Sequence, residues 1–260
     1  MVGQENLLKT IKTQIENNTF PRFAILVGDK GSGKQTLINE IQNYFDTVYK
    51  APDVKIDTIR ELIQNAYTIK TSTLFVIADA DDMSANAKNS LLKLCEEPPN
   101  NAYVIMTLQD ENNTLATIRS RGSIYKMEKY SFKELQNYDN TLPEHILKLC
   151  DNIGEIELLK KMGAEDFYNY VELTVNSIAK VSGANAFKIA NKIAFKEEDD
   201  GYNLKLFWKA FMNICIEKND RAYIKVIRAT SEALQCLRIR TVNRQMLCDS
   251  WILQVRSVLM

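Results

Sequence analysis

A glycine-rich loop that ends in a lysine is the clearest candidate for chemistry in this chain. The segment GDKGSGKQTL, residues 28–37, follows the apolar run 23–27 and leads into residues with helical spacing. In such a loop the backbone amides, the helix N-terminus and the lysine ammonium all converge on one anion. The sequence therefore predicts a phosphate-binding site made of Gly28, Gly31, Ser32, Gly33, Lys34, Gln35 and Thr36.

The residue after the lysine departs from the pattern G-x-x-x-x-G-K-[ST]. Nucleotide hydrolysis at these loops uses that hydroxyl, with an acidic residue at the end of a neighbouring strand, to hold Mg²⁺. Here the position is Gln35, whose amide cannot replace the hydroxyl, and Thr36 points about 100° further round the helix. Asp79 and Asp81 follow the next apolar run, and periodicity leaves open which of them would bind the metal.

The apolar pattern of the first half indicates the elements that position this loop. Strands are predicted at 23–27, 73–78 and 103–107, and helices at 6–17, 34–45, 56–69 and 84–97. Short apolar strands that alternate with helices imply a parallel sheet covered on both faces. The fold-class prediction is therefore an α/β P-loop domain.

The second half carries a helical pattern after about residue 127. Short helices fit residues 132–162, and longer amphipathic helices are predicted at 167–180, 186–195, 204–216, 222–237 and 242–259, with a solvated loop at 196–201. Four aromatic residues at helical spacing, Phe207, Trp208, Phe211 and Trp251, are expected to pack between these helices.

The composition excludes several classes of protein. The 260 residues are 45% hydrophobic and 25% charged, which is ordinary for a soluble globular chain, and no apolar run would span a bilayer. A cytoplasmic location is expected.

The five cysteines form no C-x-x-C pair, which argues against disulfides and a zinc site. The 33 basic and 33 acidic residues give the chain a formal net charge of zero. From Lys218 to the end, the sequence contains eight basic and three acidic residues. This basic segment could bind an acidic partner or DNA, or it could form solvated helix faces.

Two further features have ordinary structural interpretations. His145 is the only histidine and has no metal-ligand or serine partner nearby in the sequence. Glu96 and Glu97 could be paired acid–base carboxylates, but adjacent helical positions do not face the same way. A solvated helix end is expected there.

Several segments together resemble the clamp-loader branch of the AAA+ ATPases, in particular the delta-prime type of subunit of bacterial DNA polymerase III clamp loaders. They occur in the family's order within about the first 130 residues: Val2–Gln4, Phe20–Ala24, GDKGSGK, Lys55–Leu62, Asn89–Pro99 and Ala116–Gly122. The resemblance implies an AAA+ α/β domain at 1–128, a small helical lid at 129–163 and an all-helical collar, or oligomerisation domain, at 164–260.

Carried over position by position, the resemblance implies a degenerate nucleotide site. The magnesium Asp of the family falls on Ala78 and the catalytic Glu on Asp79, so the Walker B motif is degenerate. The sensor 1 region falls at Thr107. The sensor 2 arginine falls near Glu155, a carboxylate that would repel phosphate. The expected cofactor is ATP or ADP without firmly bound Mg²⁺, or none, with an empty site favoured.

One functional position of the family is retained. Arg121 matches the arginine finger that reaches into the ATP site of an adjacent subunit, although Gly122 replaces the cysteine that follows it in the family. The family's four-cysteine zinc module is absent, because the first cysteine of the chain is Cys95, so no zinc is expected.

The resemblance implies a non-catalytic, stator-like subunit of a replicative clamp loader that offers Arg121 in trans. Its implied partners are gamma/tau-type ATPase and delta-type subunits, the sliding clamp indirectly, and primer–template DNA. Two alternatives stay open: an active gamma/tau-type ATPase in which Asp79 or Asp81 binds the metal, and an AAA+ loader for another replication or repair factor.

Overall fold

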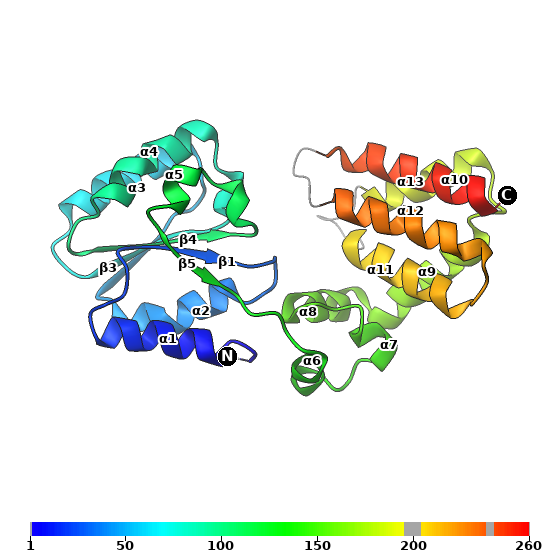
Figure 1. Cartoon of the computed structure of the whole chain (residues 1–260), viewed down its shortest axis with the longest axis horizontal. Coiled ribbons are helices and arrows are strands. Elements are labelled where there is room, and N and C mark those ends of the chain that lie inside the picture. The colour runs from blue at the N-terminus through cyan, green and yellow to red at the C-terminus, as the bar shows by residue number, and fades with distance from the viewer. Residues whose placement is uncertain (1, 195–203, 238–241, 260) are drawn as a thin grey trace. The chain divides into compact units, whose positions relative to one another are not determined.

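The computed structural model describes residues 2–194, 204–237 and 242–259. The chain divides into two compact units, Met1–Glu134 with Asn152–Gly154, and Leu135–Asp151 with Glu155–Met260 (Figure 1). The three-part division at 128 and 163 stays a prediction, and the loop expected at 196–201 lies outside the described residues. Within the described ranges, no helix has the length and apolarity needed to cross a membrane.

The first unit is built on a five-stranded, all-parallel sheet with the order β2-β3-β4-β1-β5. The strands are β1 Phe23–Val27, β2 Thr47–Lys50, β3 Thr73–Ile77, β4 Ala102–Leu108 and β5 Ser123–Lys126. The three central strands are almost entirely buried, as strands covered on both faces must be. The α/β fold class is confirmed.

Helices cover both faces of this sheet (Figure 1). They are α1 Glu5–Glu16, α2 Lys34–Ile41, α3 Ile56–Thr68, α4 Ala85–Glu96 and α5 Ala116–Arg119. One core joins α1 and α2 to Ala24, Leu26 and Val76, and the other joins α3, α4 and α5 to Ile25 and Phe75. Successive residues along each strand therefore point to opposite faces of the sheet.

Two strands were not predicted from the sequence. Both β2 and β5 lie at the edges of the sheet, and their residues are half-buried or exposed. Edge strands bury less apolar surface than central ones, so the sequences TVYK and SIYK contain no continuous apolar run. The N-cap predicted for the fourth helix is present, since Ser84 Oγ accepts a hydrogen bond from the Ala87 amide at 3.2 Å.

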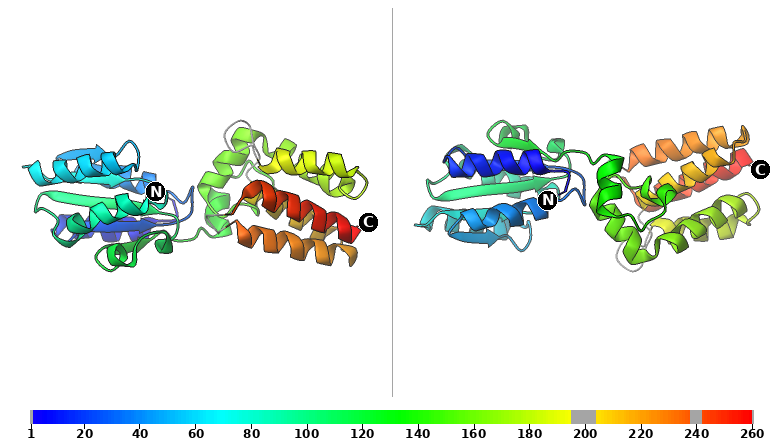
Figure 2. Two further views of the ribbon diagram at one scale, coloured as in Figure 1. Left: turned by 90° about the horizontal axis from the view of Figure 1, so that it is seen from above. Right: turned by 90° about the horizontal axis from the view of Figure 1, so that it is seen from below.

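The second unit is helical in its described residues (Figure 2). Its helices are α7 Glu144–Leu147, α9 Ala164–Ser177, α10 Gly183–Ala194, α11 Leu204–Glu217, α12 Ala222–Cys236 and α13 Arg244–Leu259. Two more helices, α6 Phe132–Tyr138 and α8 Ile153–Met162, begin in residues of the first unit and continue into the second. The predicted aromatic cluster forms its core: the rings of Phe211 and Trp251 lie 5.1 Å apart, and Trp251 Nε1 donates to Thr230 Oγ1 at 2.9 Å.

Candidate functional site

The phosphate loop connects β1 to α2 and has a conformation that depends on its glycines. Gly31 and Gly33 have φ values of 84° and 95°, a left-handed region that favours glycine. Gly33 is also the N-cap of α2, so the first-turn amides at 34–36 have no intrahelical acceptor. The loop thus presents backbone donors at a helix N-terminus, as an anion site requires.

Lys34 lies inside this loop. Its side chain is buried, and Nζ donates to the carbonyl oxygens of Gly28 at 2.5 Å and Asp29 at 3.0 Å. Burial lowers the pKa of Lys34, while the nearby charges of Asp79, Asp81 and Asp29 act in the opposite direction. Among the described residues Lys34 makes no ion pair. Its charge is thus desolvated without a bonded anion.

Other parts of the first unit wrap the loop. The Gly154 amide donates to the Gly31 carbonyl at 3.2 Å, and a Cβ on Gly154 would overlap the Gly31 backbone. Asn152 Nδ2 donates to the Lys30 carbonyl at 3.2 Å, and the Tyr130 hydroxyl donates to the Ser32 carbonyl at 3.1 Å. The sequence had indicated only a glycine-containing turn near 154 and gave no signal for Tyr130.

The loop fits a phosphate group on its own geometry. The Ser32 hydroxyl is buried and has no hydrogen-bond partner among the described residues, and Lys34 Nζ and the α2 amides share the same loop. A buried donor without an acceptor is costly, and a phosphate oxygen would satisfy it. The residues that would hold a nucleotide's phosphates are therefore Ser32, Gly33 and Lys34.

The resemblance assigns the magnesium-binding positions to Gln35 and Ala78. Gln35 Nε2 donates to Asn39 Oδ1 at 3.0 Å, and Lys50 Nζ donates to the same oxygen at 3.1 Å. Ala78 has no ligand atom. In the described part of the chain, no three His, Cys, Asp or Glu side chains gather as metal ligands would. At the two assigned positions the chain carries an amide and a methyl group in place of a hydroxyl and a carboxylate.

The acidic residues after β3 have different positions. Asp79 is exposed, and its backbone has the left-handed conformation, with a φ of 49°. Its amide donates to the Thr107 hydroxyl at 2.9 Å. Asp81 is buried, and its carboxylate accepts hydrogen bonds from the amide of Gln109 at 2.8 Å and from Asn113 Nδ2 at 2.8 Å. Asp81 therefore anchors the segment after β4, and Thr107 joins the ends of β3 and β4.

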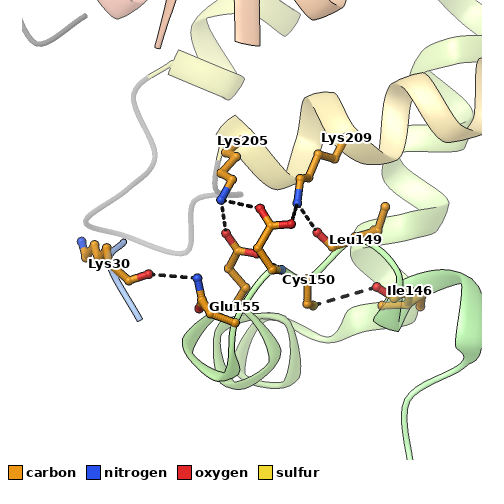
Figure 3. Close-up of polar contacts among 9 residues, drawn as sticks. Lys30, Ile146, Leu149, Cys150, Glu155, Lys205 and Lys209 are labelled. Carbon is orange, nitrogen blue, oxygen red and sulfur yellow. Dashed lines mark hydrogen bonds and ion pairs between the residues drawn. The ribbon is translucent and has the colours of Figure 1, made fainter. Parts of the chain in front are cut away.

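Glu155 belongs to an ion-pair cluster of the second unit (Figure 3). Its carboxylate lies 2.8 Å from Lys205 Nζ and accepts a hydrogen bond from the Asp151 amide at 2.7 Å. Asp151 in turn pairs with Lys205 at 2.8 Å and with Lys209 at 2.6 Å. The Glu155 charge is compensated within this cluster, a partnership that sequence spacing did not indicate.

Arg121 lies in the turn between α5 and β5. Its Nη2 is 2.7 Å from Glu96 Oε1, and Nη1 donates to the Thr117 carbonyl at 2.7 Å. Its side chain keeps 35% of its surface exposed. The neighbouring Arg119 donates to Asn112 Oδ1 at 2.7 Å. The Arg121 side chain is thus accessible to solvent and is bonded to Glu96 and Thr117.

Comparisons with known sequences point to one family. The family described as "DNA polymerase III, delta subunit" matches residues 40–131. The chain is 30% identical to DNA polymerase III subunit delta' of Bacillus subtilis over 58% of this chain, and 25% identical to DNA polymerase III subunit gamma of Buchnera aphidicola over 62%. Over these stretches the chain is similar to subunits of DNA polymerase III. The matches span 56% and 52% of the lengths of those two relatives.

Solved structures support the same fold. A DNA polymerase III gamma subunit-related protein of Thermotoga maritima aligns over 97% of this chain and 99% of its own, with a TM-score of 0.55 and 17% identity. A RuvB variant from the same organism aligns over 96% of this chain and 82% of its own, with a TM-score of 0.51 and 15% identity. At these identities the likeness concerns the fold alone.

Proposed function

We propose that this chain is a non-hydrolysing, stator-like subunit of a DNA polymerase III-type clamp loader and that it supplies Arg121 in trans to a neighbouring ATPase subunit. The observation that carries the proposal is the missing metal chemistry: Gln35 is bonded to Asn39, and Ala78 offers no carboxylate. A P-loop without bound Mg²⁺ cannot neutralise the charge that develops on the phosphates. The loop itself remains able to hold phosphate.

The proposed partners follow from the family. They are gamma/tau-type ATPase and delta-type subunits, with the sliding clamp and primer–template DNA engaged through the assembly. Arg121 is suited to the trans role because a guanidinium binds phosphate oxygens through several donors, and because its side chain is accessible. A finger of this kind accelerates phosphoryl transfer by about 10³ to 10⁵.

An active gamma/tau-type ATPase is the second candidate, supported by the match to a gamma subunit. It requires Asp79 or Asp81 to bind the metal. The Asp81 carboxylate is committed to the Gln109 amide and to Asn113, which leaves Asp79 as the available acid. Because Asp79 lies beside Thr107 rather than an α2 hydroxyl, we favour the stator-like role.

The test compares the isolated chain with the assembly. The purified chain should hydrolyse ATP no faster than its Lys34→Ala variant. In a clamp loader reconstituted with its ATPase subunits, clamp and primed DNA, Arg121→Ala should slow hydrolysis at the interface it serves by about 10³-fold. Arg119→Ala is the matched control and should leave the rate unchanged, because the resemblance assigns the finger to Arg121 and gives Arg119 no role at the neighbouring site.

Two outcomes would overturn the proposal. One is Mg²⁺-dependent turnover by the isolated chain above the Lys34→Ala background, which favours the active ATPase. The other is an assembly whose rate is insensitive to Arg121→Ala, which removes the finger. Purification of the chain with a different AAA+ target and without clamp-loader subunits would favour the third hypothesis, a loader for another replication or repair factor.

A further inference from the structure

The pairing of Arg121 with Glu96 is a feature that the proposed function leaves unexplained. Glu96 is the last residue of α4, directly before Glu97 and the Pro98–Pro99 pair. The helix dipole places partial negative charge at that end, so a carboxylate there is unfavourable unless a cation compensates it. Arg121 Nη2, 2.7 Å from Glu96 Oε1, supplies that cation.

The two contacts of Arg121 hold its guanidinium in place and leave some of its N–H donors unused. Nη2 bonds to Glu96 and Nη1 to the Thr117 carbonyl, both at 2.7 Å. A guanidinium has five N–H donors in one plane, so three remain for another acceptor. Gly122, which follows, is packed closely on Phe23 and Ile25, which fixes the backbone of the turn to β1.

We propose that Glu96 is a positioning residue for the arginine finger: with the Thr117 carbonyl, it holds the Arg121 guanidinium in one orientation with three N–H donors left for a neighbour's phosphate. This inference rests on the proposed trans role of Arg121. A free arginine side chain samples many rotamers and loses that freedom on binding. Glu96 removes part of this cost before the neighbouring subunit arrives, which is how positioning raises a rate.

The exposure of the pair sets the size of the effect. Glu96 and Arg121 keep 49% and 35% of their side-chain surfaces exposed, so solvent screens their attraction. Exposed pairs of this kind correspond to factors of about 2 to 5 in an equilibrium or a rate. Glu96→Ala should therefore lower the kcat of the reconstituted assembly by about 2- to 5-fold and leave the KM for ATP unchanged, because Glu96 itself does not contact nucleotide.

Two variants separate positioning from a merely structural role. Glu96→Gln keeps an oxygen that accepts from Nη2 and should recover part of the lost rate. Glu97→Ala removes the adjacent exposed carboxylate at the same helix end, which makes no ion pair among the described residues, and should match the wild-type rate. Thermal unfolding of each isolated variant checks that it is folded.

A double-variant cycle completes the test. If Glu96 acts through Arg121, the Arg121→Ala/Glu96→Ala assembly should be no slower than Arg121→Ala alone. A wild-type or faster rate for Glu96→Ala, an equal loss for Glu97→Ala, or an additional loss in the double variant would each overturn the role of Glu96. An Arg121→Ala assembly with wild-type turnover would instead contradict the proposed function, so the two failures are distinguishable.

Discussion

Two lysines, buried Lys34 in the first unit and half-buried Lys205 in the second, have opposite electrostatic surroundings. Lys34 in the phosphate loop is bonded to two carbonyl oxygens, and burial lowers its pKa despite the carboxylates nearby. Burial also acts to lower the pKa of Lys205, but the hydrogen bonds and the charges of Asp151 and Glu155 together outweigh that effect and raise the pKa to about 12. The difference lies in whether an anion touches the ammonium group.

This contrast separates a binding site from a structural cluster. Lys205 and Lys209 are matched by Asp151 and Glu155, so the charges of that cluster are compensated within the chain (Figure 3). Lys34 has no such match among the described residues, and the buried Ser32 hydroxyl beside it has no partner. A buried cation whose pKa is lowered and that touches no carboxylate is a mark of a functional site. The proposed phosphate would bring a direct anionic contact to Lys34.

The largest expected effect comes from removing the lysine that is paired. Lys205→Met leaves Glu155, whose side chain is 7% exposed, without its cation. We expect a loss of about 3 kcal/mol in the free energy of unfolding, because breaking a buried pair leaves an uncompensated charge. Urea denaturation followed by far-ultraviolet circular dichroism measures it.

Lys34→Met is the matched control for that experiment. It removes a desolvated ammonium group that no carboxylate contacts, so we expect the free energy of unfolding to stay within about 1 kcal/mol of wild type. Equal losses in the two variants would contradict the distinction between the two lysines.

Restoring the metal ligands should give the next largest effect. The double variant Gln35→Thr/Ala78→Asp returns a hydroxyl and a carboxylate to the magnesium position. We expect Mg²⁺ to raise its affinity for ATP by about tenfold or more, since a divalent ion then bridges protein and phosphates. Calorimetric titration with Mg²⁺ and with a chelator measures this.

Wild type provides the reference in the same titrations. Its affinity for ATP, whether weak or absent, should not increase when Mg²⁺ is added. A clear increase would indicate a metal ligand in the native loop, with Asp79 as the leading candidate, and would return the active ATPase to first place.

Sequence reasoning predicted the central elements better than the details of the site. The buried strands 23–27 and 73–77, the phosphate loop and the Ser84 cap depend on local patterns, namely apolar runs, glycine spacing and a capping hydroxyl. The edge strands β2 and β5 were missed because little of their surface is buried.

The partners of charged residues could not be predicted in the same way. Glu155 and Lys205 are fifty residues apart, and Glu96 and Arg121 are joined only through the packing of α4 and α5. Side-chain spacing within one helix reveals neighbours three or four positions away, but not partners on another element. For that reason Glu96 was interpreted as a solvated helix end.

A pH titration tests the paired lysine through its raised pKa. The ordinary pKa of lysine is 10.5, and that of Lys205 in the folded chain is about 12. The stability that this shift contributes is fully present below 10.5 and is lost as pH rises toward 12. The stability difference between wild type and Lys205→Met should therefore shrink by about 1 kcal/mol between pH 9 and about 11.5.

The pH control keeps the charge in place. Lys205→Arg retains a cation that does not titrate in this range, so its difference from Lys205→Met should stay nearly constant over the same interval. A difference that shrinks equally for lysine and arginine would mean that other groups cause the alkaline loss.

The smallest expected effect is at Gln35, where the phosphate loop departs from its pattern. The Gln35 amide is exposed and bonds to Asn39 four residues along α2, and alanine is at least as good a helix former. Gln35→Ala should therefore change the free energy of unfolding by less than about 0.5 kcal/mol and leave nucleotide affinity unaltered. Equilibrium unfolding and calorimetry measure both quantities. A loss of affinity would mean that the Gln35 amide turns toward the phosphates and replaces part of the missing metal chemistry, so the loop would be a metal-free nucleotide site rather than a remnant of a hydrolytic one.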